Sequence, residues 1–511
     1  MKQTDRTSLS NSAIINGIAV FFTIALFIAS YHAATYTYEA GRVFHDWYTI
    51  MITPCPLVTD YLEVGGLSSA FLNAGACSLV CVMFMIGLKG ESHANTLAGY
   101  FLVIAHCFYG LNLLTMLPCF LAPFIYLRCH KLDFKNNLHI CMFTTSFGPF
   151  ISEFLFRYTQ QEEYVFGEVR LTAAGIALAA GFVIMLGFIV PAILPGAHAW
   201  HKGYNLYNGG LAFGIFGFFL YNFLYKTMEV APPVPVEHFN VVYEYFDRSF
   251  DMFANRFFFI VFPLCIYVGY VLDGRSFENY NRLICDTGHR SDFAANYGMP
   301  ACLVNIGWVG LMFVFYLNLI MMFTEGAGYT GPTIGVVLAA LTFTAMGQHP
   351  KNIWPILAGY LLLYLAAMLL CRLTGREIGW TISTQAYING AAFATGLCPI
   401  VGHYGIRAGA AAGFLCASMC TATSALHGGL VLYNGGFTAG ITALILLPIL
   451  EHYISEKRGE VKYPPFMKVS SMIALVEQIS GGAQKQAKGK AQNASGQPEP
   501  SVQQESPEEK A

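Results

Sequence analysis

The chain has 511 residues, of which 55% are hydrophobic and only 11% are charged, whereas about 25% of an ordinary soluble domain is charged. The charge is also unevenly spread, because residues 452–511 hold 15 of the 58 charged side chains. This composition excludes a soluble enzyme, a nucleic-acid-binding protein and a disordered scaffold. Repeated apolar runs of about 20 residues instead predict an all-α, polytopic transmembrane bundle whose surroundings are a lipid bilayer.

Taken in chain order, the apolar runs predict 13 or 14 membrane spans. The run at 96–127 is too long for one plain helix and contains Pro118 and Pro123, which predicts a kinked helix or two short ones. The complete series of runs is 12–34, 66–88, 96–127, 137–157, 171–194, 203–226, 256–272, 302–323, 328–347, 353–373, 383–402, 406–425 and 428–450.

The charges at the two ends of the chain orient the predicted spans. Residues 1–60 are predicted to hold a short head, the first helix and a loop, and Lys2 and Arg6 place that head inside. Lys457, Arg458 and Lys462 place the C-terminus in the cytoplasm of a cell-membrane protein. Two cytoplasmic ends require an even number of spans and favour 14, but Arg372 and Arg376 do not fit cleanly, so the sequence leaves the topology open. Residues 453–511 are predicted to form a juxtamembrane segment and a disordered tail.

An internal repetition is the strongest signal in the sequence. Residues 201–215 read HKGYNLYNGGLAFGI, residues 427–441 read HGGLVLYNGGFTAGI, and nine of the 15 positions are identical. At an offset of 260, the string LAGY at 97–100 also meets LAGY at 357–360. We predict two repeats of about five spans at 61–226 and 321–452, joined by loops and two linker spans at 227–320. The sequence leaves open whether the repeats are parallel or inverted.

The repeated YNGG and LAGY segments resemble a bacterial family of multi-span membrane proteins with a duplicated domain of unknown function, number 1576. That resemblance covers most of residues 12–452 and implies no activity. The steps Tyr207-Asn208-Gly209 and Tyr433-Asn434-Gly435 are also similar to the Y-N-G step of urea transporters, which have two copies of a five-helix unit. The other pore signature of that family, L-P-x-x-T-x-P-F, is not found in full in this chain.

The asparagine of each YNGG segment is the leading candidate for solute binding. We expect each asparagine to lie about two turns into an apolar span, with the two following glycines breaking the helix. Such a break frees backbone polar groups, which membranes tolerate where they line a cavity or pack on protein. The alternative is a tight helix contact at the glycines. The candidate residues are Tyr207, Asn208 and Gly209 with Tyr433, Asn434 and Gly435.

Histidine and glutamate side chains within the predicted spans form a second group of candidates. His201 and His427 begin the repeated segments and could relay protons, or could lie hydrated at the membrane interface. Glu153 and His403 occupy equivalent positions at an offset of 250, and an ionisable group inside a span marks a site by default. The alternative for Glu153, which lies near the end of its run and close to Arg157, is that its side chain simply snorkels to the membrane surface.

Two proline kinks complete the candidate site. Pro149 and Pro399 should bend their helices and free carbonyls near Thr145 and Thr395. The sequence has no P-loop, no H-E-x-x-H, no G-x-S-x-G and no oxygen-ligand cluster, so we predict neither a cofactor nor a metal. Fourteen cysteines occur without any C-x-x-C pair, and we interpret them as packing residues.

These features favour a transporter or channel for a small polar solute or ion, with its site where the repeats meet. The alternatives are a non-transporting sensor or assembly protein and, less favoured, a membrane-embedded enzyme that uses the histidines. The sequence is compatible with a homo-oligomer and indicates no nucleic-acid partner. A carrier predicts that Asn208 and Asn434 lie near the pseudo-symmetry axis and face one polar cavity.

Overall fold

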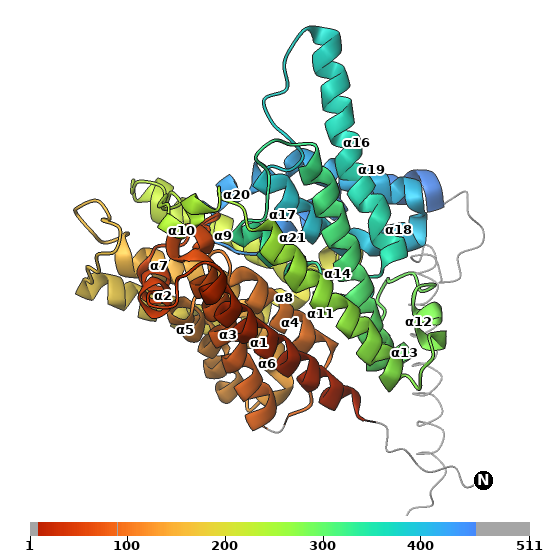
Figure 1. Cartoon of the computed structure of the whole chain (residues 1–511), viewed down its shortest axis with the longest axis horizontal. Helices are drawn as coiled ribbons and strands as arrows, with labels where there is room; N and C mark the ends of the chain where they lie inside the picture. The colour runs from red at the N-terminus through yellow and green to blue at the C-terminus, as the bar shows by residue number, and fades with distance from the viewer. Residues whose placement is uncertain (1–8, 89, 456–511) are drawn as a thin grey trace, which may run out of the picture. The chain divides into compact units, whose positions relative to one another are not determined.

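The computed structural model describes residues 9–88 and 90–455, and the regular structure in these ranges is helical (Figure 1). No strand occurs among the described residues, where an isolated bridge joins Asp60 and Tyr109. The predicted all-α, multi-span membrane fold is therefore confirmed. Seven described helices are long and apolar enough to cross a membrane: α1 (Asn11–Tyr36), α3 (Tyr61–Gly87), α8 (Ala173–Trp200), α11 (Asp251–Leu272), α14 (Met299–Met322), α16 (Pro350–Thr374) and the helix Asn434–Ile454 that begins with α21 (Asn434–Leu450).

The remaining predicted spans are shorter or broken helices. The run 96–127 forms two helices, α4 (Ala94–His106) and α5 (Leu113–Cys129), as one of the two alternatives predicted. The other elements of the first half are α2 (Val43–Ile52), η1 (Lys135–Asn137), α6 (Leu138–Thr144), η2 (Thr145–Phe147), α7 (Gly148–Phe156), α9 (Asn208–Tyr221) and η3 (Asn222–Thr227). Those of the second half are α10 (Val241–Tyr245), α12 (Glu278–Leu283), α13 (Phe293–Tyr297), α15 (Gly331–Ala339), α17 (Gln385–Ala394), η4 (Thr395–Leu397), α18 (Cys398–Tyr404), α19 (Ile406–Met419), α20 (Thr423–Leu426) and η5 (Glu451–Ser455).

Two of the sequence predictions concern residues outside the described ranges. Lys2 and Arg6 precede residue 9, and the predicted C-terminal tail with its orienting charges follows residue 455. Contacts divide the chain into Met1–Pro448 and Ile449–Ala511. The packing of the two copies described below is that of the first unit.

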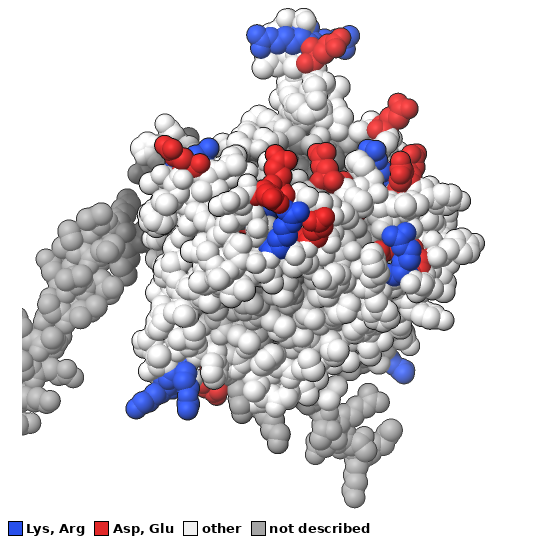
Figure 2. Space-filling view, turned by 90° about the vertical axis from the view of Figure 1, so that its left-hand side faces the viewer, with Lys and Arg blue, Asp and Glu red and all other residues white. Residues whose placement is uncertain are grey.

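The surface agrees with a lipid environment. Figure 2 shows the charged side chains of one face gathered towards its upper and lower ends, with a broad band between them that carries none. Large apolar side chains face outwards on the long helices, such as Ile184 on α8 and Ile260 on α11, which are 53% and 67% exposed. In water such exposure would be costly, whereas in a bilayer these side chains contact acyl chains.

The second copy begins earlier in the chain than the sequence predicts. Asp60 caps the start of α3 with its side chain, and Asp292, at an offset of 232, caps α13 in the same way. Gly66 interrupts α3 with a φ of 77°, and Gly298, at the same offset, separates α13 from α14 with a φ of 84°. The pair α13–α14 is therefore the counterpart of α3, and residues 292–322 belong to the second copy.

A matching break follows the next helix in each copy. Asn73 of α3 and Asn305 of α14 each donate two hydrogen bonds to the backbone of the break, and a glycine with positive φ, Gly110 or Gly347, lies within it. The acceptors are the carbonyls of Cys107 and Leu111 in the first copy and of Thr344 and Gln348 in the second. These acceptors and glycines are related by an offset of 237, which matches α4 with α15 and α5 with α16. The LAGY match at offset 260 would instead pair α4 with α16, so that alignment is corrected.

Each copy thus contributes seven segments. The first copy contains α1, α3, α4, α5, the broken helix α6–η2–α7, α8 and α9. The second contains α11, α13–α14, α15, α16, the broken helix α17–η4–α18, α19 and α21. An odd number of crossing segments in one copy inverts the next.

Equivalent helices of the two copies are antiparallel where they touch. Gly331 at the start of α15 packs against Phe108, and Gly335, one turn later, packs against Ala105 of α4. The end of α1 likewise lies beside the beginning of α11, where the rings of Tyr36 and Phe253 are 5.9 Å apart. The repeats are therefore inverted, which is the alternative that the sequence left undecided.

Candidate functional site

The two YNGG segments meet at a crossing of α9 and α21. Gly210 and Gly436 occupy equivalent positions in the repeated segments, and they touch each other: a Cβ added to Gly210 would lie 2.5 Å from the Gly436 carbonyl carbon. The flanking contacts are also equivalent, because Gly214 packs on Phe437 and Gly440 packs on Leu211. The pseudo-twofold axis therefore passes through this glycine contact, which allows the two backbones to approach.

The helical break lies before each asparagine and not after it. Asn208 is the first residue of α9 and Asn434 is the first residue of α21, and the preceding residues, 201–207 and 427–433, form turns. The predicted break in the backbone is present, but the predicted place of the asparagines two turns into a helix is wrong. Each asparagine instead stands at the N-terminal end of a helix, where the helix dipole is positive.

A buried histidine supports each asparagine. In the second copy, His427 Nε2 lies 3.0 Å from Asn434 Oδ1, and in the first copy His201 lies beside Asn208. Both histidines are fully buried, so the alternative of a hydrated histidine at the membrane interface is wrong. Because an amide oxygen only accepts, His427 Nε2 acts as the donor and the Asn434 amide nitrogen is turned away from it.

Backbone hydrogen bonds connect each YNGG turn to the proline-kinked helix of the other copy. The Leu206 N–H donates to the carbonyl of Gly396 and the Leu432 N–H donates to the carbonyl of Ser146, both at 2.9 Å. Those carbonyls are available because α6–η2–α7 and α17–η4–α18 are broken there, as Pro149 and Pro399 predict. Each copy therefore completes the turn of its partner.

The threonines of the two breaks occupy equivalent places. Thr145 Oγ1 donates to the carbonyl of Met142 and Thr395 Oγ1 donates to that of Ala392, each at 2.6 Å. Thr145 lies near Tyr433 and Thr395 lies near Tyr207, again across the two copies. Thr145 and Thr395 thus stand behind the tyrosines and do not line either pocket described below.

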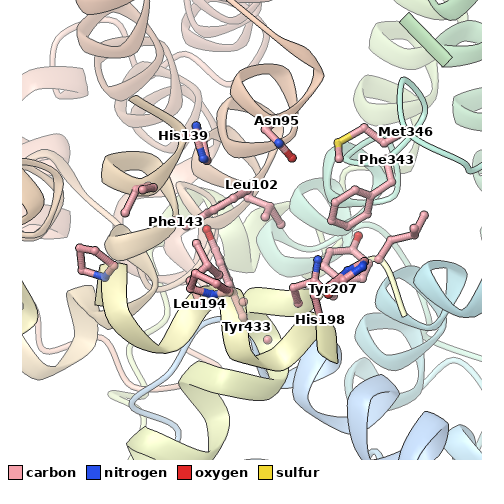
Figure 3. A pocket seen from close by; sticks show the side chains of 17 residues that line it. Asn95, Leu102, His139, Phe143, Leu194, His198, Tyr207, Phe343, Met346 and Tyr433 are labelled. Carbon is pink, nitrogen blue, oxygen red and sulfur yellow. The ribbon is translucent and has the colours of Figure 1, made fainter. Parts of the chain in front are cut away.

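Asn208 lines a pocket of about 260 Å³, here called the first pocket. Figure 3 shows Asn95, His139, His198, Tyr207 and Tyr433 around it, with Phe143, Leu194 and Met346 among the apolar walls. Asn208, Gly209 and Gly210 of α9 complete the lining.

Asn434 lines a smaller pocket of about 50 Å³, here called the second pocket. Its walls are the counterparts of the walls of the first pocket, at the offsets that relate the two copies. The equivalent pairs are His139 and Asn389, Ile140 and Gly390, Phe143 and Phe393, Leu194 and Cys420, His198 and Ser424, Leu206 and Leu432, Asn208 and Asn434, Gly209 and Gly435, and Met346 and Tyr109. The prediction of one cavity shared by both asparagines is therefore corrected to two related pockets beside one axis.

Two of the predicted site residues lie away from both pockets. Glu153 is buried, and its carboxylate pairs with Arg157, whose Nε lies 3.1 Å from both carboxylate oxygens. Glu153 therefore does not snorkel to the surface, and it lines neither pocket. His403 is partly exposed and packs near His289 and Tyr204, with ring centroids 6.2 and 5.6 Å away. His403 is likewise removed from the site.

Several lining residues were missed by the sequence reasoning. His198 could have been found, because it lies at the same offset of 226 from Ser424 as the asparagines lie from each other. His139 and Asn389 are also related by the offset of 250. Because they are different residue types, a search for identical residues does not find this pair. Tyr109 and Met346 become equivalent only through the offset of 237, which the sequence does not reveal.

The pockets offer neutral polar groups within apolar walls. Neither lining contains Asp, Glu, Lys or Arg, and no group of three or more His, Cys, Asp or Glu in the described residues is arranged to hold a metal ion. Such walls can hold a small polar guest by hydrogen bonds from amide, imidazole, hydroxyl and backbone groups. Tyr207 and Tyr433 both line the first pocket, which also includes Gly210 of the glycine contact.

A family model described as "Protein of unknown function (DUF1576)" matches the chain in two stretches, residues 39–226 and 272–452. The first stretch begins before α2 and ends within η3, and the second begins at the end of α11 and ends within η5. Comparison with curated proteins and with solved structures finds no match. The matched stretches cover most of the chain, and the chain therefore belongs to the family of membrane proteins of unknown function described as DUF1576.

Proposed function

We propose that this protein is an integral-membrane transporter or channel for a small polar solute or ion, with its site where the inverted repeats meet. One observation carries the proposal: two equivalent pockets, each at the start of a half-helix, lie on either side of the Gly210–Gly436 contact. A rotation that exchanges antiparallel helices also exchanges the two sides of a membrane. If one pocket opens towards one side of the membrane, its equivalent therefore opens towards the other side, as the entrance and the exit of a transporter do.

The unequal size of the pockets supports an alternating mechanism. The first pocket has about 260 Å³ and the second about 50 Å³, although nine of the residues that line each pocket are equivalent. If the two copies exchange conformations, the second pocket opens while the first closes, and a guest passes from one pocket to the other. This exchange requires no covalent chemistry, so we propose that the chain is not an enzyme. We further propose a plasma-membrane location with a cytoplasmic C-terminus, which the sequence charges support.

The test is uptake of a panel of small solutes into proteoliposomes. We expect the parent to take up at least one solute, and we expect Asn208→Leu and Asn434→Leu each to reduce its uptake by about tenfold or more. Asn222→Leu is the matched control, because Asn222 follows α9 and lines neither pocket; its uptake should stay within about twofold. Elution as a single peak in detergent checks that each variant folds. Failure of the parent to take up any solute, or unchanged uptake in both pocket variants, contradicts the proposal.

A further inference from the structure

The electrostatics of the two pockets distinguish between classes of solute. The N-terminus of α9, a helix of 14 residues, opens on the first pocket, and that of α21, with 17 residues, opens on the second. Each helix therefore presents the positive end of its dipole to the pocket. Neither lining contains a carboxylate to balance a cation.

Each pocket is lined by a buried tyrosine whose hydroxyl makes no hydrogen bond of standard distance and angle. Tyr433 lines the first pocket and is 2% exposed, and Tyr109 lines the second and is 1% exposed. Thr145 lies beside the Tyr433 hydroxyl without a hydrogen bond of standard geometry, and a buried donor left without a full partner is costly. Figure 3 shows Tyr433 at the wall of the first pocket, from where its hydroxyl can donate to a guest.

The asparagine of the second pocket is also oriented as a donor. His427 Nε2 occupies Asn434 Oδ1, and the amide nitrogen of Asn434, which lines the second pocket, remains as a donor. One basic side chain lies close to the first pocket: Arg290 Nη2 donates to the backbone carbonyl of Lys202, and Arg290 packs near His198 of the lining. Helix dipole, hydroxyl, amide and neighbouring charge all favour a negative guest.

Resting on the proposed function, we propose that the solute is a small monovalent anion. It binds at the start of α9 in the first pocket, where the Tyr433 hydroxyl donates to it, and at the start of α21 in the second, where the Tyr109 hydroxyl and the Asn434 amide donate. A cation would meet two positive helix ends without a carboxylate, and a neutral solute would gain nothing from those ends.

Flux measurements in proteoliposomes test the class of solute. The probes are formate, nitrate and chloride as anions, urea and glycerol as neutral solutes, and sodium and potassium as cations. We expect the parent to conduct at least one anion about tenfold faster than any neutral or cationic probe. Flux of urea, glycerol, sodium or potassium without flux of an anion overturns the anion assignment and leaves transport standing. Absence of flux for every probe overturns both proposals.

Tyrosine variants test the binding site itself. Tyr433→Phe and Tyr109→Phe each remove one hydroxyl and keep the ring, and each should raise the anion concentration at half-maximal flux by about three- to tenfold. Tyr225→Phe is the matched control, because Tyr225 also has a buried hydroxyl without a partner but lines neither pocket. Anion flux that is unchanged in both pocket variants, or reduced equally in the control, overturns the assignment of these hydroxyls.

Discussion

Asp60 shows how one carboxyl joins the two copies. Its Oδ1 accepts hydrogen bonds from the N–H groups of Leu62 at 2.8 Å and of Gly331 at 3.1 Å, so it caps the starts of α3 and α15 together. Its Oδ2 accepts a hydrogen bond from the Tyr243 hydroxyl at 3.3 Å. Burial nevertheless raises the pKa of Asp60 to about 7. Its counterpart Asp292 is exposed and caps its own copy alone.

The raised pKa of Asp60 predicts a pH dependence of stability. An acid whose pKa is raised by folding stabilises the fold below its ordinary pKa, about 3.9, and this stabilisation is lost as the pH rises through about 7. The loss for a shift of this size is on the order of 4 kcal/mol. Asp60→Asn should reduce the pH dependence of the free energy of unfolding between pH 4 and 7, as measured by denaturant unfolding in detergent. Asp292→Asn is the control, and an equal slope in parent and Asp60→Asn would argue against the assignment.

Individual site residues were predictable where both copies keep the same side chain. Asn208 and Asn434 with their tyrosines and glycines were found because nine identities cannot arise from apolar bias. Glu153 was misassigned because its partner Arg157 lies one turn away, and the sequence cannot show whether such a neighbour is paired. The tyrosine hydroxyl of Tyr109 was missed because its counterpart is Met346, so repetition gave no signal there.

At the scale of elements, the contact between α9 and α21 limits the size of two side chains. Gly210 faces the backbone of Gly436, while Gly181 of α8 has open space around its Cβ position. Both glycines lie in helices. Replacing either glycine by alanine therefore raises the intrinsic stability of its helix by the same amount, about 1 kcal/mol.

This difference predicts opposite outcomes for two alanine substitutions. Gly210→Ala should lower the free energy of unfolding by about 1–3 kcal/mol, because the new methyl group overpacks the crossing. Gly181→Ala should raise it by up to about 1 kcal/mol. Thermal unfolding of the two variants in the same detergent measures both. Equal stabilisation by both substitutions would show that the crossing has room, contrary to the described contact.

The sequence predicted that helices are broken, but it did not predict which helices of the two copies are equivalent. Proline marks the kinks at Pro149 and Pro399, because proline removes a backbone donor wherever it occurs. The partner of α4 was misassigned because the four-residue LAGY string recurs by chance in α16, at an offset of 260 instead of 237. A fixed offset therefore matched LAGY strings that occupy different helices, while the true equivalents Gly110 and Gly347 are single glycines without a motif.

At the scale of the whole molecule, inversion makes the two pockets alternatives to each other. Leu194 of the first pocket and Cys420 of the second are equivalent positions. Cys420 is 3% exposed, in keeping with the small volume of its pocket. A thiol at either position therefore reports which pocket is open.

Labelling in oriented vesicles tests this alternation. We expect a membrane-impermeant maleimide to modify Leu194→Cys from one side of the membrane and Cys420 from the other, as read by peptide mass spectrometry. The solute identified by uptake should change the two labelling rates in opposite directions. Cys129 is exposed at the end of α5 and outside both pockets, so its rate should stay constant. Labelling of both positions from the same side would refute the alternation.

The reciprocal hydrogen bonds Leu206 to Gly396 and Leu432 to Ser146 also bear on biogenesis. While the ribosome is still translating, the turn before α9 reaches the bilayer without the carbonyl that it needs, because the broken helix that supplies this carbonyl is made much later. The first half must wait, incompletely folded, until the second half is inserted. We therefore expect maturation of this protein to end in a late docking of the two halves rather than in a stepwise addition of finished helices.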